Sequence, residues 1–289
     1  LVVIDHRLTP TAEMADHVIA PRLELERADV PHIMDRRFPE PYTNYTPAVL
    51  ETDDDLITEW EVFAGIAARN GSTIDLPGGP IPMEDGRVAP SVDDDVIIDL
   101  VYGNARIDLD TVRADRGTIR ADRAIEVVEA DPGADARFAV APDDVVAELA
   151  DLTDGAVPST RPFRLVSRRL KHVLNSLGPE LDGLARVGTT NEAHLHPHDI
   201  AELGLTDGDI VAISSDRGTI DGVVASADDV RRGVVSMSHS WGGRSHDDLD
   251  VRSHGSPTNR LVSVDEGYAP ITGMAIQSAI PVSLRPRTD

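Results

Sequence analysis

The sequence predicts an α/β region followed by a mostly β region, which makes the fold α+β overall. Three observations predict this order. Residues 1–4 are a short apolar run, typical of a buried parallel strand. Residues 55–70 carry apolar side chains three or four positions apart, which indicates an amphipathic helix. From residue 163 onward, short β-type runs alternate with Gly-containing turns, as in a small β-barrel.

The α/β region begins with the strand predicted at residues 1–5. A short helical segment follows it, with Thr9 as the N-cap. In the helix predicted at residues 55–70, Gly71 stands where a C-terminal cap belongs. The apolar face of that helix consists of Leu56, Ile57, Trp60, Phe63, Ile66 and Ala67.

The middle of the chain is less regular. Residues 96–101 fit either a strand or part of a helix, and residues 145–152 predict a further helix. Glycine and proline mark residues 153–162 as a linker. We therefore expect two domains, residues 1–155, which include an unassigned insert at about 72–155, and residues 160–289.

The second domain is expected to be the barrel. Turns at residues 206–209 and 216–218 separate its runs, and residues 198–204 predict one or two helical turns that end on Gly204. The predicted strands are Phe163–Val166, Ala193–Leu195, Ile210–Ser214, Thr219–Ala225, Gly233–Met237 and Ala279–Leu284.

The composition excludes several classes of function. Acidic residues number 51 against 27 Lys and Arg, and the resulting net charge of −24 repels nucleic acid. No apolar stretch approaches the ~20 residues that a membrane span needs. The chain contains no cysteine, which excludes disulfides, iron–sulfur ligation and thiol catalysis within it. Adaptation to high salt is an alternative explanation of the acidic composition.

The first residues indicate a piece of a longer protein. The chain does not begin with Met, and it opens directly on a predicted strand. It shows neither the basic segment nor the long apolar segment of a signal peptide. We therefore expect further sequence upstream of Leu1.

Residues 196–218 read HPHDIAELGLTDGDIVAISSDRG. This segment resembles the pattern HPxDAxxLGxxDGDxVxVxSxRG of the molybdopterin dinucleotide-binding domain, found in molybdopterin oxidoreductases of the DMSO reductase and formate dehydrogenase superfamily. Ser238 and Ser240 depart from the family, which has proline and glycine there, and Ala269 stands in place of aspartate. Further similar segments occur in the family's order at Leu1–Pro21, Arg168–Ser176, Gly233–Gly243, Thr258–Leu261 and Pro270–Met274.

The resemblance implies a double-psi β-barrel that binds bis-molybdopterin guanine dinucleotide (bis-MGD) with molybdenum or tungsten. The cofactor would carry the two-electron redox chemistry of a small substrate of the formate, nitrate or sulfur-oxyanion type. The metal ligand and any iron–sulfur cluster would lie in the missing N-terminal part. This chain would then have no catalytic residue and would be inactive alone. Its partners would be that N-terminal catalytic region or catalytic subunit, and an electron-transfer subunit.

The phosphates and ring edges of such a cofactor define the residues expected to bind it. Arg168 and Arg169 suit phosphate, because a guanidinium group binds two oxygens at once. Asn175, Ser176 and Asn259 suit ring edges, since they carry amide and hydroxyl groups. The other candidates are His196 in the motif, Ser215, Arg217 and Gly218 on a tight turn, and His239 and Trp241 on the pterin side.

Several candidates also have a plainer interpretation. In so acidic a chain, Arg168 and Arg169 also suit surface ion pairs. Arg217 suits an ordinary hairpin tip, Asn259 a turn and Trp241 a hydrophobic core.

The histidines at positions 194, 196 and 198 alternate as residues on one face of a strand do. That spacing suits zinc or nickel. Pro197 interrupts the run, however, and only His196 belongs to the resembled pattern. We therefore expect no metal ligand in this chain.

Two other functions also fit the sequence. The chain could be a non-catalytic cofactor-binding subunit of a split enzyme, or a double-psi barrel that serves as a binding or adaptor module. Recovery of pterin and GMP from the protein would exclude the adaptor. The expected location is cytoplasmic, and a twin-arginine signal upstream would instead indicate a periplasmic or exported protein.

Overall fold

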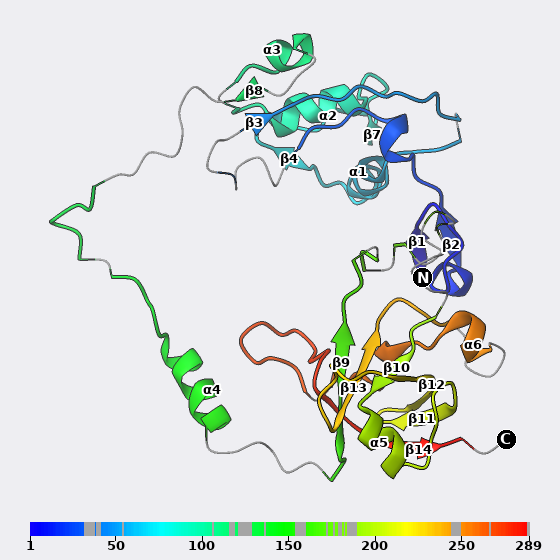
Figure 1. The fold of residues 1–289 in the computed structure, drawn as a ribbon. Helices are drawn as coiled ribbons and strands as arrows, with labels where there is room; N and C mark the ends of the chain where they lie inside the picture. Colours follow the sequence, from blue (N-terminus) through cyan, green and yellow to red (C-terminus); the bar gives the residue numbers. More distant parts are fainter. Residues whose placement is uncertain are drawn as a thin grey trace. The chain divides into compact units, whose positions relative to one another are not determined.

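The computed structural model describes residues 1–31, 38, 42–53, 55–105, 107–115, 119–120, 129–135, 137–153, 160–171, 173–175, 177–178, 181, 183, 190–243, 250–265 and 267–287. The chain divides into two compact units, Leu1–Asp135 and Ala136–Asp289 (Figure 1). The first unit is mixed α/β and the second contains a closed barrel, which confirms the predicted fold class. No helix in the described ranges is long and apolar enough to cross a membrane.

The first unit opens with β1 (Val2–Ile4), which pairs in parallel with β2 (His17–Ile19). The 3₁₀ helix η1 (Ala12–Met14) connects them, and the Thr9 hydroxyl accepts a hydrogen bond from the Ala12 N–H at 3.3 Å. The predicted strand is confirmed, but its predicted burial is wrong, since Val2 is 56% exposed. Two strands alone offer too little surface to cover each other.

The rest of the first unit consists of short elements. Its antiparallel pairs are β3 (Tyr42–Thr43) with β8 (Ile119–Arg120), β4 (Asp75–Leu76) with β5 (Gly79–Pro80), and β6 (Met83–Glu84) with β7 (Arg87–Val88). Its helices are η2 (Glu24–Glu26), α1 (Glu59–Arg69), α2 (Asp94–Val101) and α3 (Leu109–Ala114).

Helix α1 begins at a capping box. The Glu61 carboxylate accepts hydrogen bonds from the N–H and the hydroxyl of Thr58, at 2.6 Å and 2.9 Å. The helix ends as predicted, because Gly71 adopts φ +70°, the left-handed conformation of a C-terminal cap. The expected apolar face is present but partly open to solvent, with Phe63 and Ile66 more than half exposed.

Residues 96–101, which fit either a strand or a helix by sequence, form most of α2. The Asp93 side chain caps the helix, accepting a hydrogen bond from the Val96 N–H at 2.9 Å. Ile98 of α2 packs with Leu109 and Val112 of α3 in a small buried cluster.

The second unit contains all six strands predicted for the barrel. They are β9 (Phe163–Arg168), β10 (Ala193–Leu195), β11 (Ile210–Ser214), β12 (Thr219–Ser226), β13 (Val234–Ser238) and β14 (Ile280–Pro286). They close in the order β10–β12–β11–β14–β9–β13. The β10–β12 and β9–β13 pairs are parallel and the other four are antiparallel.

Two helices of the second unit match the sequence. Helix α4 (Asp143–Thr153) confirms the helix predicted at residues 145–152, while residues 154–159 of the predicted linker lie outside the described residues. Helix α5 (Pro197–Glu202) confirms the helical turn, and Gly204 follows it at φ +68°. Helices α6 (Val251–His254) and η5 (Thr258–Leu261) lie between β13 and β14.

The barrel encloses one hydrophobic core. Burial along β12 alternates from residue to residue, because successive side chains of a strand point to opposite faces. Fully buried side chains in the core include Leu165, Leu195, Ile213, Ile220 and Met237.

Strand direction decides which connections meet. Strands β9, β11 and β13 run in one direction, and β10, β12 and β14 run in the other. One end of the barrel therefore collects the C-terminal ends of the first three strands and the N-terminal ends of the others. We call this end the Arg168 rim, after the last residue of β9.

Candidate functional site

Nine of the eleven predicted site residues lie on connections of the Arg168 rim. Two others differ. Ser176 lies outside the described residues, and His196 begins α5 after the C-terminal end of β10, at the opposite rim. The nine are Arg168, Arg169 and Asn175 at and after β9, Ser215, Arg217 and Gly218 between β11 and β12, His239 and Trp241 after β13, and Asn259 in η5.

The pairing of β9 with β13 brings two of these residues together. Because the strands are parallel and Ser238 is paired with Arg168, the next residues, Arg169 and His239, are neighbours. The Arg169 Nη1 lies 3.2 Å from the Nε2 of His239 and 3.3 Å from the Oδ1 of Asn175. Asn175 adopts φ +54°, a left-handed conformation that asparagine tolerates better than most residues. The site therefore joins segments 70 residues apart.

The contact with Arg169 defines which nitrogen of the His239 imidazole carries the proton. Burial, and secondarily the positive charge of Arg169, lower the pKa of His239 from its ordinary value, which favours the neutral ring. Arginine can only donate, so Nε2 accepts and the proton of the neutral ring is assigned to Nδ1. That Nδ1 is buried and has no hydrogen-bond partner in the described structure.

Trp241 supplies a second unsatisfied donor on the same loop. Its side chain is only 6% exposed, and its Nε1 has no hydrogen-bond partner among the described residues. A buried donor without an acceptor costs ~1–3 kcal/mol. The burial agrees with the plainer interpretation of Trp241 as a core residue. A purely structural role in the core does not account for its unpaired N–H, however.

Asn191 holds this loop in place, and sequence reasoning missed it. Its buried amide donates hydrogen bonds to the Ser238 and Ser256 carbonyls, at 2.7 Å and 2.8 Å, and accepts one from the Ser256 N–H at 2.7 Å. Gly255, at φ +68°, fits against it closely. A Cβ there would lie 2.3 Å from the Asn191 Oδ1. No motif marks Asn191, because its partners lie 47 and 65 residues away.

Ser240 keeps the loop in a conformation that glycine favours. Its φ is +80°, in the left-handed region that costs a residue with a Cβ ~1–2 kcal/mol. The resembled pattern has glycine at this position. The departure noted in the sequence therefore changes the side chain and keeps a glycine-like backbone.

The turn between β11 and β12 makes the contacts of an ordinary hairpin tip, the plainer interpretation of Arg217. The Ser215 N–H donates to the Gly218 carbonyl at 2.9 Å, and the Arg217 N–H donates to the Ser215 hydroxyl at 3.1 Å. The Arg217 guanidinium forms an ion pair with the exposed carboxylate of Asp265. Gly218 lies close to η5, because a Cβ there would be 3.2 Å from the Arg260 carbonyl oxygen.

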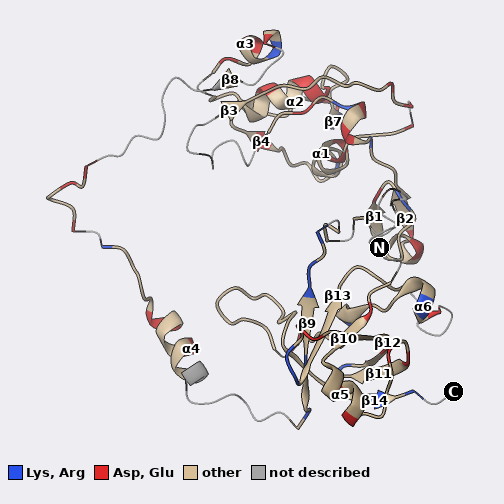
Figure 2. Ribbon diagram, viewed as in Figure 1, with Lys and Arg blue, Asp and Glu red and all other residues tan. Residues whose placement is uncertain are grey.

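Positive charge gathers where β9 ends. Figure 2 shows Lys and Arg at the tip of β9 and along the segment after it, where Arg168, Arg169 and Lys171 follow closely in sequence. Within the described structure, Arg169 and Lys171 have no carboxylate in ion-pair range, and Arg168 reaches the exposed Asp229 only at 4.0 Å. Arg168 also contributes to the lowered pKa of His194, whose larger cause is burial.

The three histidines do not form a metal site. His194 lies in β10, whereas His196 and His198 belong to the start of α5, where the His196 Nδ1 accepts a hydrogen bond from the His198 N–H. The chain turns after β10, so the alternation expected on a strand is lost. The described residues contain no group of three His, Asp or Glu side chains suited to a metal ion.

Together these groups would suit an anionic ligand with ring edges. The cations of Arg168, Arg169 and Lys171 suit phosphate. The unpaired N–H groups of His239 and Trp241 suit acceptor atoms of a buried ring. A molybdopterin dinucleotide carries both features, so the residues present fit this cofactor.

Comparison with known proteins agrees with this class. A family model described as "Molydopterin dinucleotide binding domain" matches residues 163–279. The structure of acetylene hydratase from Pelobacter acetylenicus is similar in fold, with a TM-score of 0.67 and 17% sequence identity. The similarity covers 99% of this chain and 40% of that chain. No curated protein matches the sequence.

Proposed function

We propose that the Arg168 rim binds molybdopterin guanine dinucleotide for a bis-MGD oxidoreductase of molybdenum or tungsten. Arg168 and Arg169 bind the phosphates, and Asn175, Ser176 and Asn259 bind ring edges. His239 and Trp241 face the pterin, and the Ser215–Gly218 turn lies beside the ligand. His196 is not included, because it begins α5 at the opposite rim.

One observation carries this proposal. Arg169 contacts both Asn175 and His239, and Trp241, two residues after His239, has a buried unpaired N–H. A cation, an amide and two free donors thus come from the segments after β9 and β13. A ligand that brings phosphate and ring acceptors would satisfy all of them at once.

The redox assignment rests on the sequence resemblance. The similar solved structure is named as a hydratase, so the fold alone does not select oxidation over hydration. The cofactor, when bound, supplies the two-electron chemistry, and this chain binds and orients it. The substrate class that we propose is a small formate, nitrate or sulfur-oxyanion species.

We further propose that the chain acts together with an N-terminal catalytic region or a separate catalytic subunit, and with an electron-transfer subunit. The chain spans 40% of the similar structure's length. In addition, Val2 and Val18 of the β1–β2 pair are 56% and 41% exposed, and Leu1, just before β1, is 59% exposed. Parallel sheets are normally covered on both faces, so these side chains suit a further protein surface. The location proposed is the cytoplasm, or the periplasm if a twin-arginine signal precedes the chain.

The two alternative functions differ in whether the chain binds the cofactor. A non-catalytic subunit of a split enzyme would bind the same cofactor at the same rim. A barrel used as an adaptor would bind no guanine nucleotide. The unpaired N–H of Trp241 favours a ligand-binding rim over an adaptor.

The proposal is tested by calorimetric titration of the purified chain with GDP, which carries the guanine and pyrophosphate of the cofactor. We expect GDP to bind more tightly than ADP. Arg169→Gln should weaken GDP binding about tenfold or more, since hydrogen bonds to charged groups contribute ~1.5–3 kcal/mol. The matched control is Arg231→Gln, which lies just before β13 at the opposite rim. Equal losses in the two variants would contradict the assignment.

A further inference from the structure

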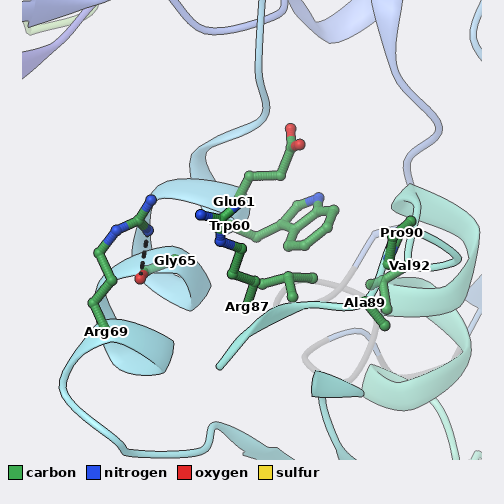
Figure 3. A pocket seen from close by; sticks show the side chains of 9 residues that line it. Trp60, Glu61, Gly65, Arg69, Arg87, Ala89, Pro90 and Val92 are labelled. Carbon is green, nitrogen blue, oxygen red and sulfur yellow. Dashed lines mark hydrogen bonds between the residues drawn. The ribbon is translucent and has the colours of Figure 1, made fainter. Parts of the chain in front are cut away.

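The N-terminal unit contains a pocket of about 320 Å³ between α1 and the segment that includes β7 (Figure 3). Trp60, Gly65 and Arg69 line it from α1, and Arg87, Pro90 and Val92 line it from the other side. Pockets that hold small molecules begin at about 300 Å³. The volume therefore limits the occupant to a small ligand.

The indole of Trp60 is held in a fixed position. Its N–H donates a hydrogen bond to the Oδ1 of Asp94 at 2.7 Å. The hydroxyl of Thr58, which is 1% exposed, lies 3.2 Å from the same oxygen, and Arg22 pairs with the other oxygen at 3.5 Å. The polar edge of the ring is thus satisfied, and the rest of the ring is available to the pocket.

Two guanidinium groups lie at this pocket without a carboxylate partner. Arg69 donates to the Gly65 carbonyl at 2.9 Å, and the Arg87 guanidinium forms no hydrogen bond or ion pair within the described ranges (Figure 3). Glu61 also lines the pocket, but its carboxylate already accepts two hydrogen bonds from Thr58. In a chain with a net charge of −24, cations that lack carboxylate partners are available to an anion from solution.

Gly65 makes room for this arrangement. A Cβ at Gly65 would lie 3.1 Å from the Nη1 of Arg69, so a side chain there would require the guanidinium group to shift by a few tenths of an ångström. Glycine inside a helix destabilises it relative to alanine. Glycine at position 65 therefore lowers the stability of α1 but leaves space for the Arg69 guanidinium.

We propose that this pocket binds a small anion with a planar ring, such as an aromatic carboxylate. The anionic group lies between Arg69 and Arg87, and the ring stacks on Trp60 beside Pro90 and Val92. Guanidinium groups recognise carboxylates through paired hydrogen bonds, and aromatic rings favour stacked neighbours. This site lies in the first unit and does not depend on the function proposed for the Arg168 rim.

Tryptophan fluorescence of the full chain tests the proposal, with benzoate as the probe. The chain has two tryptophans, so Trp60→Phe identifies the signal that comes from the pocket. We expect saturable quenching by benzoate. Two analogues should bind at least about tenfold more weakly than benzoate. Benzamide lacks the charge, and cyclohexanecarboxylate lacks the planar ring. Arg87→Gln should reduce benzoate affinity about tenfold, whereas the exposed control Arg285→Gln should not change it.

A second variant tests the role of Arg69 without a risk to folding. Gly65→Ala should raise the midpoint of thermal unfolding, because alanine favours helix, and should weaken benzoate binding by moving Arg69. No quenching by benzoate, equal binding of benzamide, or an Arg87→Gln variant with unchanged affinity would overturn the proposal. Unchanged affinity in Gly65→Ala would contradict the part assigned to Arg69.

Discussion

Replacement of Asn191 by alanine removes the hydrogen bonds that hold the loop of His239 and Trp241 in place. The variant loses two donated hydrogen bonds and one accepted bond, all within a buried region. The Ser256 N–H is left without its acceptor, which costs ~1–3 kcal/mol. The two carbonyls add less, since each has a second lone pair. We expect the variant to lose about 3 kcal/mol of unfolding free energy, because such terms are only partly additive.

The measurement is urea unfolding followed by Trp241 fluorescence in a Trp60→Phe background, so that only the barrel is observed. For a unit of about 150 residues, the same loss lowers the melting temperature by ~6–12 °C. The matched control is Asn104→Ala, because exposed Asn104 makes one hydrogen bond, to the Pro77 carbonyl at 3.0 Å. That control is read from far-UV circular dichroism and should lose less than about 1 kcal/mol. A loss in Asn191→Ala no larger than in this control would refute the reasoning.

Three further predictions concern backbone strain, ionic strength and pH. Ser240→Gly should stabilise the barrel by ~0.5–1 kcal/mol in urea unfolding, since it relieves the cost of φ +80° against a smaller entropic cost of glycine, and Ser240→Ala should not. The melting temperature should rise between 0.1 M and 1 M KCl, because the Debye length falls from ~10 Å to ~3 Å and the repulsion within a chain of charge −24 is screened; a constant or lower value would exclude net repulsion as a limit on stability. Burial and nearby arginines lower the pKa of both His194 and His239. The neutral histidines therefore contribute to the stability of the folded chain above pH 6.5, and this contribution is lost as pH falls below it. The double variant His194→Gln/His239→Gln should therefore lose less stability than the wild-type chain between pH 7 and pH 5.5, and an equal loss would contradict the assignment.

The sequence predicted the barrel well, because each of its strands is marked locally. Alternation in Thr219–Ser226 and the glycine turns at either side are visible without any knowledge of pairing. The short helix at Pro197–Glu202 is marked in the same way, by proline at its start and Gly204 after its end. The exposure of β1 and of Phe63 was not predictable, since periodicity defines an apolar face but not what covers it.

The site could be predicted only in part, because it depends on strand order. Arg169 and His239 were both recognised, but their contact follows from the parallel pairing of β9 with β13. His196 was grouped with them because it belongs to the same motif, and strand direction places it at the opposite rim. Asn191 escaped notice because a buried asparagine acquires its role from distant carbonyl groups.

The central claim is that the Arg168 rim holds a molybdopterin guanine dinucleotide. The most direct measurement is the pterin and GMP content of the full chain, purified from cells that synthesise the cofactor, in the wild type, Arg169→Gln and the control Arg231→Gln. We predict pterin and GMP in the wild type and the control, and a marked loss in Arg169→Gln, because that variant removes the cation between Asn175 and His239. Absence of both compounds from the wild-type chain, or equal amounts in all three proteins, would contradict the account.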